Sequence, residues 1–335
     1  MPITAKEIAR RLGLSEAAVS LALNNRPGVS TSTRQLVWDT AKELGYDFTR
    51  NHFKTQRSRG AVLLLKYMKT GALSHDGPYF THLIEGARTG CRRSGLSLEI
   101  RTIYEDERIE DQLYTLEQEK WAGLILLATE MDRTSLRHFD AFKLPIILLD
   151  AQIEGARFDS VSIHNDQGAV MAVSHLIAKT RALPGYLHSS YASPNFEARF
   201  TGFYRGVRQH GMSTASCVLH LLSPSEEGAY ADMKEHLRHG EALARCYFAD
   251  SDAIAAGAMR ALQEAGYRIP EDVAVVGFDD LPLCETTVPP LTSIHVPARY
   301  MGEMAALRLS QVIEGGAHFP MRMEIGASLK KRRSV

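Results

Sequence analysis

The sequence has few cysteines, and their spacing excludes the sites that cysteines usually build. The four cysteines are Cys91, Cys217, Cys246 and Cys284, and no two of them form a C-x-x-C pair. Neither a disulfide framework nor a cysteine-ligated zinc site is therefore indicated. Scattered thiols of this kind are typical of a reduced intracellular protein, and we predict no metal site and no cofactor.

Long apolar segments are also missing. The longest apolar runs, at residues 123–128 and 144–149, are far shorter than the ~20 residues that cross a membrane. The first residues, MPITAKEIARR, lack the apolar core of a secretory signal. We therefore expect a cytoplasmic protein that makes no membrane contact.

Catalytic and phosphate-binding motifs are absent from the sequence as well. It contains no G-x-S-x-G, H-E-x-x-H, G-x-G-x-x-G or G-x-x-x-x-G-K-[ST] pattern. His164, close to Asp166, is a candidate base, but a polar cleft residue is the favoured interpretation. The sequence predicts that the protein is not an enzyme.

Net charge is lacking too, because 39 basic and 39 acidic side chains cancel, but the two signs are unevenly distributed. Residues 1–60 contain ten Lys or Arg and five Asp or Glu, and so carry about +5, which the rest of the chain balances. A small basic module on a mildly acidic body is typical of a protein that contacts an anionic polymer.

The amino-terminal region contains the signals of three short helices. Thr4 and Glu7 form a capping-box pattern, Ser15 is a good N-cap for a helix over 16–23, and a third helix begins near 30–33. We expect a small core formed by Ile8, Ala9, Leu12, Leu14, Val19, Leu23, Leu36, Val37, Ala41 and Leu44. The pattern predicts a helix-turn-helix whose second helix has an outer face small enough for the DNA major groove. A three-helix cap that packs on the body is the alternative.

From residue 61 onward, strand-like apolar runs alternate with amphipathic helices. The predicted strands are 61–67, 96–103, 122–128, 144–151, 182–189, 216–222, 244–250 and 272–280. The predicted helices are 79–95, 107–120, 168–178, 196–211, 226–239 and 253–266. Strands separated by helices form parallel, doubly wound sheets, and two such runs in succession predict two subdomains with a cleft between them.

Polar residues follow several of the predicted strands, at the ends where ligands of such sheets bind. They are Asp150, Ser251, Asp252, Asp279 and Asp280. Carboxylates accept hydrogen bonds from hydroxyl groups, so this edge favours a hydroxyl-rich ligand such as a sugar. For Asp252 and Asp280, a helix N-cap or a subdomain hinge is an equally good interpretation.

The amino-terminal pattern resembles the DNA-binding domain of the lactose-repressor (LacI) family. The resemblance rests on A-x-x-x-G-L-S-x-x-x-V-S-x-x-L-N-N-R-P-G-V-S, which ends at residue 30, and on TRQLVWDTAKELGY at 33–46. It implies that Glu16, Ala17 and Leu21 read base edges. The residues expected to contact DNA are Thr4, Ser15, Glu16, Ala17, Ala18, Ser20, Leu21, Asn24, Arg26, Arg34, Phe53 and Lys54.

Two of these positions depart from the family pattern. Ala18 stands where the family usually has Thr, which removes a hydroxyl that can reach a phosphate. Leu21 stands where some members have Arg, so that bidentate reading of guanine is not available there.

Residues 47–60, DFTRNHFKTQRSRG, are predicted to be a basic linker. In the LacI family this segment becomes a hinge helix on operator DNA, and a leucine wedges into the minor groove. No leucine is present here, and we assign the wedge to Phe53, with Lys54 as a backbone contact. The alternatives are an alignment that puts Thr55 at the wedge position and an unstructured tether.

The body resembles the effector domain of the same family, which has the periplasmic-binding-protein type I fold. Matching segments such as EARFTGFYRG and DSDAIAAGAMRALQEAGYRIPEDVAVVGFDD extend over residues 77–311. The residues that the resemblance assigns to effector binding are Tyr79 and Phe80 on a loop at 78–80, Asp150, Arg199, Ser251 and Asp279. Ile163 and Ser223 replace aromatic residues of other members, so the pocket chemistry differs from theirs.

These observations together predict a small all-α helix-turn-helix domain followed by an α/β body of two doubly wound parallel-sheet subdomains. The expected domains are a helix-turn-helix at 1–46, a hinge or linker at 47–60, and an effector-binding body at 61–333. Within the body we expect an N-subdomain of about 61–162 and 292–319 and a C-subdomain of about 163–291 and 320–333.

The predicted function is that of a homodimeric transcriptional repressor of sugar or related catabolic genes. It would bind a near-palindromic operator in double-stranded DNA and respond to a small effector, a sugar or related polyol, in the cleft. The alternative is a cleft-fold enzyme or sugar carrier with a vestigial DNA module.

Overall fold

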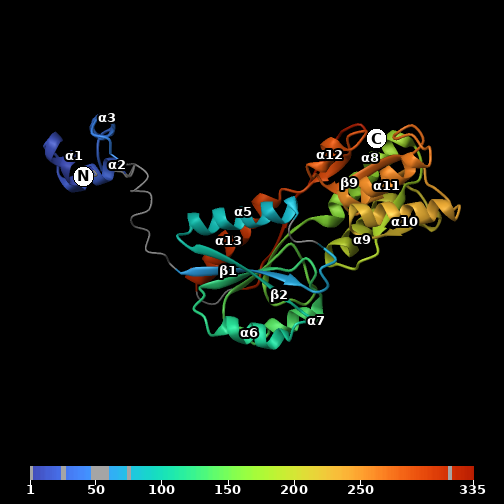
Figure 1. Cartoon of the computed structure of the whole chain (residues 1–335), viewed down its shortest axis with the longest axis horizontal. Coiled ribbons are helices and arrows are strands. Elements are labelled where there is room, and N and C mark those ends of the chain that lie inside the picture. Colours follow the sequence, from blue (N-terminus) through green and yellow to red (C-terminus); the bar gives the residue numbers. More distant parts are fainter. Residues whose placement is uncertain (1–2, 24–27, 47–59, 74–76, 316–318) are drawn as a thin grey trace. The chain divides into compact units, whose positions relative to one another are not determined.

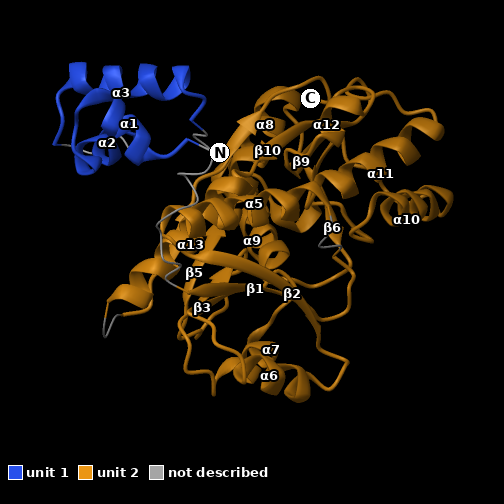
Figure 2. Cartoon of the chain, turned by 60° about the vertical axis from the view of Figure 1, so that its left-hand side comes forward, with its two compact units in different colours: residues 1–58 blue, residues 59–335 orange. Residues whose placement is uncertain are grey.

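The chain divides into two compact units, Met1–Ser58 and Arg59–Val335 (Figure 2). Each unit has an apolar core of its own. The computed structural model describes residues 3–23, 28–46, 60–73, 77–315 and 319–335. Within these residues, no helix combines the length and the apolar character that crossing a membrane requires.

The described part of the first unit consists of the helices α1 (Ala5–Leu12), α2 (Glu16–Leu23) and α3 (Thr31–Glu43) (Figure 1). The predicted capping box is present: Thr4 Oγ1 accepts a hydrogen bond from the Glu7 N–H, and the Glu7 carboxylate accepts one from the Thr4 N–H at 2.7 Å. At the start of α2, Ser15 Oγ accepts a hydrogen bond from the Ala18 N–H at 3.1 Å. The predicted helix-turn-helix is confirmed.

The core of the first unit takes side chains from all three helices and from the residues that follow α3. They are Ile8, Ala9, Val19, Ala22, Leu23, Val37, Ala41 and Tyr46. The prediction that Leu36 belongs to this core is wrong, because it is 52% exposed. Val37 and Ala41 lie on the buried face of α3, and Leu36 lies about 100° round the helix from Val37, at the flank of that face. This packing stabilises α2, since a helix of eight residues does not persist alone in water.

The second unit begins with a parallel sheet, which we call the first sheet. Among the described residues its strand order is β11-β5-β4-β3-β1-β2. The strands are β1 (Ala61–Met68), β2 (Ser97–Tyr104), β3 (Gly123–Leu127), β4 (Ile146–Leu149), β5 (Asp159–Ile163) and β11 (Arg322–Ile325). The central strands β3 and β4 are continuous apolar runs because both faces of the sheet are covered.

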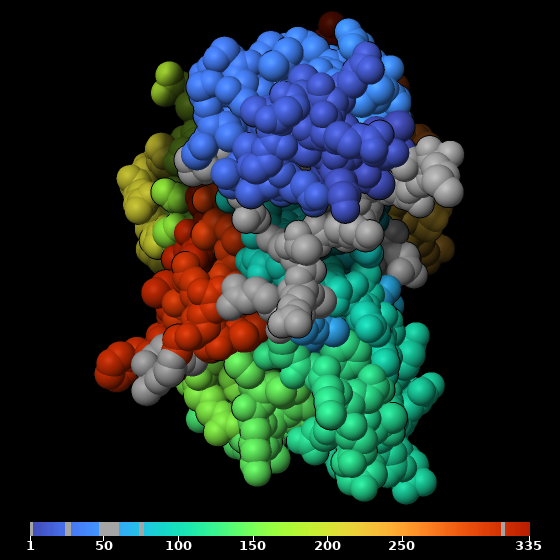
Figure 3. Space-filling model, turned by 90° about the vertical axis from the view of Figure 1, so that its left-hand side faces the viewer, coloured from blue at the N-terminus to red at the C-terminus, as the bar shows by residue number. Residues whose placement is uncertain are grey.

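Helices cover both faces of the first sheet (Figures 1 and 2). One face packs against α5 (Pro78–Arg93) and α13 (Ala298–Glu314). The other face packs against α6 (Ile109–Glu117), α7 (Arg133–Leu136) and the 3₁₀ turn η1 (Arg137–Phe139). In the space-filling view, red segments from the last part of the chain lie at the surface beside green segments from the first half of the chain (Figure 3). The first sheet with these helices is the first subdomain.

The second subdomain is built around a second sheet, with the order β12-β10-β9-β8-β6-β7 among the described residues. Its strands are β6 (Gly185–Ser189), β7 (Leu219–Leu222), β8 (Cys246–Ala249), β9 (Ala274–Asp279), β10 (Thr292–His295) and β12 (Ser328–Lys330), and β12 runs antiparallel to β10. Its helical segments are α8 (Asn165–Thr180), α9 (Pro194–Gln209), η2 (Thr214–Ser216), α10 (Glu226–Arg238), α11 (Asp252–Glu264) and α12 (Leu283–Thr286). The predicted body of two parallel-sheet subdomains is confirmed.

In the described residues the chain crosses between the subdomains after β5, after β10 and after β11. The prediction placed residues 292–319 wholly in the first subdomain and 320–333 wholly in the second. Instead, β10 pairs with β9 of the second sheet, and β11 pairs with β5 of the first. Each strand is completed in one sheet before the chain crosses, and so short a strand does not reveal from its composition which sheet it joins.

Glycines allow α5 and α13 to approach each other closely. A Cβ atom on Gly86 would overlap the backbone oxygen of Arg299, and one on Gly302 would overlap the backbone oxygen of Leu83. These glycines are therefore required by contact between two backbones, which cannot move aside as a side chain can.

We expect Gly302→Ala to lower the free energy of unfolding by about 3 kcal/mol, because the added methyl group forces the two helices apart. Gly326→Ala is the matched control, since a Cβ there has no neighbour within 4 Å, and we expect a change of about 0.5 kcal/mol or less. Urea unfolding of both variants measures the difference. Equal stability of the two variants would show that the helices are not in close contact.

Candidate functional site

The second unit contains a cavity of about 280 Å³ between its two subdomains. Both sheets present the carboxyl ends of their parallel strands to this cavity, as expected for a ligand site in such a fold. The first subdomain contributes the residues after β3 and β4 and the first turn of α5, and the second contributes the starts of α9 and α11 and the end of β9. The polar lining residues include Thr129, Asp150, Ser193, Asn195, Arg199, Ser225, Ser251 and Asp279.

Arg199, on α9, is the buried cation of the cavity and is only 4% exposed. Its Nε donates a hydrogen bond to Asn165 Oδ1 at 2.8 Å, and Nη1 donates to the backbone oxygen of Asp250. The guanidinium lies over the ring of Phe278, 3.7 Å from its centroid. The third nitrogen, Nη2, is 3.6 Å from Asp279 Oδ1. The side chain is thus held in one orientation, with Nη2 facing the carboxylate of Asp279.

Asp150 lies opposite, directly after β4, and is fully buried. Tyr79 donates its hydroxyl hydrogen to Oδ1 at 2.5 Å, and Thr129 donates to Oδ2 at 2.7 Å. Burial raises the pKa of the Asp150 carboxyl above its usual value, and the Thr129 and Tyr79 hydroxyls oppose the shift. Each oxygen keeps further acceptor capacity, since a carboxylate oxygen accepts from two directions.

Asp279, at the end of β9, completes the charged group. Burial raises the pKa of its carboxyl well above the usual range, and the Arg199 guanidinium opposes that shift. Asp279 has a φ of 110° and Asp150 a φ of 66°, in the left-handed region that non-glycine residues rarely adopt. Backbone strain of this kind concentrates where a side chain has to be aimed at a ligand.

The cavity combines hydrogen-bond donors and acceptors with aromatic walls. Tyr79, Phe80 and Phe196 line it beside the charged residues. An arrangement with one guanidinium, two carboxylates and aromatic rings can bind a small polar ligand that has both hydroxyl groups and apolar faces.

Three of the residues expected at this site need closer definition. Tyr79 and Phe80 line the cavity as expected, but they lie in the first turn of α5 and not on a loop, because Pro78 is the first residue of the helix. Ser251 lines the cavity and is also the N-cap of α11, accepting a hydrogen bond from the Ile254 N–H at 3.3 Å.

Asp252 and Asp280 are held by other protein groups and do not line the cavity. Asp252 accepts hydrogen bonds from the Ser293 hydroxyl at 2.6 Å and from the Leu281 N–H at 2.8 Å. Asp280 forms an ion pair with Arg332 at 2.8 Å. The interpretation of these two residues as structural groups fits better than a ligand role.

Three other residues do not line the cavity either. Ile163 is buried in the apolar core, and the hydroxyl of Ser223 donates to Asp232 at 2.7 Å. The candidate base His164 has its Nε2 2.8 Å from Asp166 Oδ1, and neither residue is among those that line the cavity.

Sequence reasoning missed Thr129 and Asn195, which line the cavity beside Asp150. Thr129 lies just beyond the end of β3, so the strand-end rule that selected Asp150 would also have found it. Asn195 donates to the backbone oxygen of Asp150 at 2.8 Å and accepts from Asn165 at 2.9 Å. A contact of this kind between two subdomains leaves no local signal in the sequence.

In the first unit, the expected DNA-contacting residues lie mainly on and around α2. Glu16, Ala17 and Ser20 are exposed on this helix, and Ala18 and Leu21 are half-buried. Ser15 and Thr4 are exposed helix caps, and Arg34 is half-buried in the first turns of α3. The assignments of Asn24, Arg26, Phe53 and Lys54 lie outside the described residues.

Comparisons with known proteins match both units. Residues 4–47 match the family described as bacterial regulatory proteins, lacI family, and residues 173–335 match a periplasmic binding protein-like domain. The chain is 25% identical over 337 residues to the HTH-type transcriptional repressor PurR of Actinobacillus pleuropneumoniae, an alignment that covers 99% of this chain and 98% of that protein.

Solved structures are similar over the whole length. A transcriptional regulator CelR–cellobiose complex has 25% sequence identity and a TM-score of 0.75, over 99% of this chain and 100% of that one. The Lac repressor dimer bound to operator and the anti-inducer ONPF shares the fold, with 22% identity and a TM-score of 0.70, over 100% and 99% of the two chains. The chain therefore belongs to the LacI family: it is a DNA-binding transcriptional regulator with a periplasmic-binding-protein-like effector domain, and not an enzyme.

Proposed function

We propose that this regulator represses sugar or related catabolic genes and that a sugar or related polyol in the cavity controls its affinity for DNA. The observation that carries the proposal is the pair of Arg199 and Asp279 facing Asp150 in a cavity lined by both subdomains. The proposed effector-binding residues are Tyr79, Phe80, Asp150, Arg199, Ser251 and Asp279.

The chemistry of the cavity supports a sugar. Carboxylates such as Asp150 and Asp279 accept hydrogen bonds from hydroxyl groups, and bonds of this kind to charged groups are the stronger ones. The rings of Tyr79 and Phe80 can pack against the apolar face of a pyranose or furanose. A volume of about 280 Å³ is just below the ~300–1,000 Å³ of typical ligand pockets, which favours a small ligand. A similar regulator is known in complex with cellobiose.

The first unit supports operator binding through α2. Its exposed residues Glu16, Ala17 and Ser20 are small or polar, and this suits a helix that enters the major groove. We propose that the chain acts as a homodimer on a near-palindromic operator, since two helix-turn-helix units related by a twofold axis match a site with the same symmetry. The Lac repressor, which shares this fold, is a dimer bound to operator.

The position of the cavity between the subdomains can couple effector binding to DNA binding. A ligand that touches Asp150 in one subdomain and Arg199 in the other stabilises one closure angle between them. In a dimer, a change in that angle alters the distance between the two DNA-binding units. The ligand and the operator then influence each other's affinity by the same factor.

A ligand screen on the full-length protein tests the proposal. Pentoses, hexoses and disaccharides are compared with nucleobases and nucleosides by the rise in Tm, and hits are added to a fluorescence-anisotropy titration of labelled DNA from upstream of the gene. We expect a sugar to raise the Tm and to change operator affinity by at least tenfold, about 1.4 kcal/mol of coupling. A response to nucleobases but not to any sugar would contradict the sugar assignment. Failure to bind the upstream DNA would show that this DNA does not contain the operator.

A further inference from the structure

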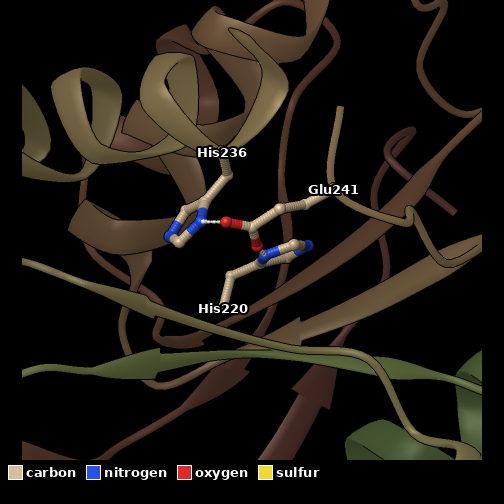
Figure 4. A group of neighbouring side chains, drawn as sticks. All are labelled: His220, His236 and Glu241. Carbon is tan, nitrogen blue, oxygen red and sulfur yellow. Dashed lines mark hydrogen bonds and ion pairs between the residues drawn. The ribbon is translucent and has the colours of Figure 1, made fainter. Parts of the chain in front are cut away.

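Three side chains meet at the edge of the second subdomain, away from the residues that line the effector cavity. His220 comes from β7, His236 from the last turn of α10 and Glu241 from the segment that follows α10 (Figure 4). Their ligand atoms all lie within 4.8 Å of one another. The Glu241 carboxylate lies between the two imidazoles, with Oε1 2.8 Å from His236 Nδ1 and Oε2 3.3 Å from His220 Nδ1.

In each imidazole, Nε2 has a partner outside this group of three side chains, and Nδ1 faces the Glu241 carboxylate. His236 Nε2 is 3.3 Å from the backbone oxygen of Leu221, and since a carbonyl only accepts, this nitrogen carries the hydrogen. In the neutral ring, Nδ1 then has a lone pair that faces an oxygen of Glu241. Two acceptors at 2.8 Å require a proton or a cation between them.

His220 gives the second, independent observation. It is 1% exposed, and among the described residues its Nδ1 has no hydrogen-bond partner although it points at Glu241. Its Nε2 lies 3.2 Å from the Tyr247 hydroxyl, which orients the ring. A buried ring nitrogen without a hydrogen-bond partner costs free energy, and a bound ion would remove that cost.

We propose that His220, His236 and Glu241 bind a divalent transition-metal ion of the zinc class. Two imidazoles and one carboxylate are a common zinc donor set, and a fourth, tetrahedral position would be open to water. Mg²⁺ and Ca²⁺ prefer oxygen ligands and do not suit two imidazoles. The contacts of His220 with Tyr247 and of His236 with the Leu221 carbonyl are the outer hydrogen bonds that orient metal-binding histidines.

A metal ion at this site would affect the neighbouring structure because of the elements that it joins. It joins β7 to the C-terminal end of α10, and the segment between these elements, residues 223–225, contributes Pro224 and Ser225 to the effector cavity. A bound ion would therefore restrain one wall of that cavity. Metal binding itself depends neither on an effector nor on DNA, so its test is independent of the proposed function.

Zinc binding is measured on the full-length, tag-free protein after chelator treatment, by competition with a chromophoric chelator and by thermal unfolding. We expect one Zn²⁺ per chain and a rise in Tm of about 5 °C when zinc exceeds its Kd by ~100-fold. Co²⁺ in place of zinc is expected to give the intense visible bands of a tetrahedral site.

The variants separate a metal site from a simple ion pair. His236→Gln and Glu241→Gln are each expected to lower zinc affinity by more than about 100-fold, beyond the 10–100-fold that loss of an outer partner costs. Both side chains are partly exposed, so these variants should fold. His239→Gln, an exposed histidine at the C-cap of α10, is the matched control and should bind zinc like the wild type. Cys217→Ser should do the same.

Two results would overturn the proposal. One is zinc binding that His236→Gln and Glu241→Gln leave unchanged, which would place the ion elsewhere. The other is the absence of both a Tm rise and cobalt bands in the wild type, which would show that a proton on His236 alone joins the ring to Glu241.

Discussion

Removal of residues 1–58 is expected to abolish operator binding and to leave the remaining chain folded and able to bind its effector. The first unit has its own core, and the second unit contains both sheets and the whole cavity. Specific binding exceeds non-specific binding by ~10³–10⁷-fold, so the loss of affinity should be at least about 10³-fold. Fluorescence anisotropy with operator DNA measures binding, and thermal unfolding with and without the effector shows that the second unit is intact.

A matched pair of substitutions locates the interaction within the first unit. Ala17→Glu adds bulk and negative charge to the exposed face of α2, and we expect it to weaken specific binding by about 100-fold or more. Leu36→Glu adds the same charge at the exposed flank of α3 and should weaken binding by only about a few-fold, through general repulsion of phosphates. Equal losses in the two variants would show that α2 does not enter the groove. Operator binding by the truncated chain would refute the role of the whole unit.

The second large effect is expected for Arg199→Ala, which should remove the response to the effector while operator affinity stays nearly unchanged. The substitution removes the cavity's guanidinium and leaves Asp279 without its cationic neighbour. Hydrogen bonds to charged groups contribute about 1.5–3 kcal/mol each, so losing one or two of them lowers effector affinity by about 10-fold or more. Isothermal titration of the effector and anisotropy of the operator complex measure the two affinities separately.

Arg205→Ala is the control for this substitution. Arg205 lies on the same helix, α9, and pairs with Asp166 at 2.5 Å outside the cavity lining, so its loss should leave the effector response intact. Because Arg199 also bonds Asn165 and the Asp250 backbone, its removal lowers the Tm, and Asp279→Asn serves as a second variant that keeps these bonds. If Arg199→Ala and Asp279→Asn respond at the wild-type effector concentration, the assignment of the cavity is wrong.

Features that depend on neighbours in the chain could be predicted from the sequence. The capping box of α1 and the Ser15 cap of α2 are set within four residues, and both are present as expected. The alternation of strands and helices follows from periodicity, and it led to the strand ends at which Asp150 and Asp279 lie. Local patterns thus found two of the charged groups of the cavity.

Features that depend on distant parts of the chain could not be predicted in this way. The sheet that each of the short strands β10 and β11 joins is decided by pairing with β9 and β5, and nothing within four residues encodes that choice. The same holds for Asn195, whose partners lie on other elements, and for Leu36, whose exposure depends on how α3 rotates against α1 and α2. His220 and His236 meet only because β7 and α10 pack side by side.

The crossings between the subdomains have a mechanical consequence. In the described chain the backbone crosses after Ile163, after His295 and after Ile325, and the His164 N–H donates to the Ile325 oxygen at 2.9 Å, which ties the first crossing to the last. Three covalent connections between the two lobes restrict sliding and twisting more than they restrict rotation about a line through the connections. We therefore expect the relative motion of the two lobes to be mainly one rotation, through which an effector bound between them, as proposed above, would act whatever its chemistry.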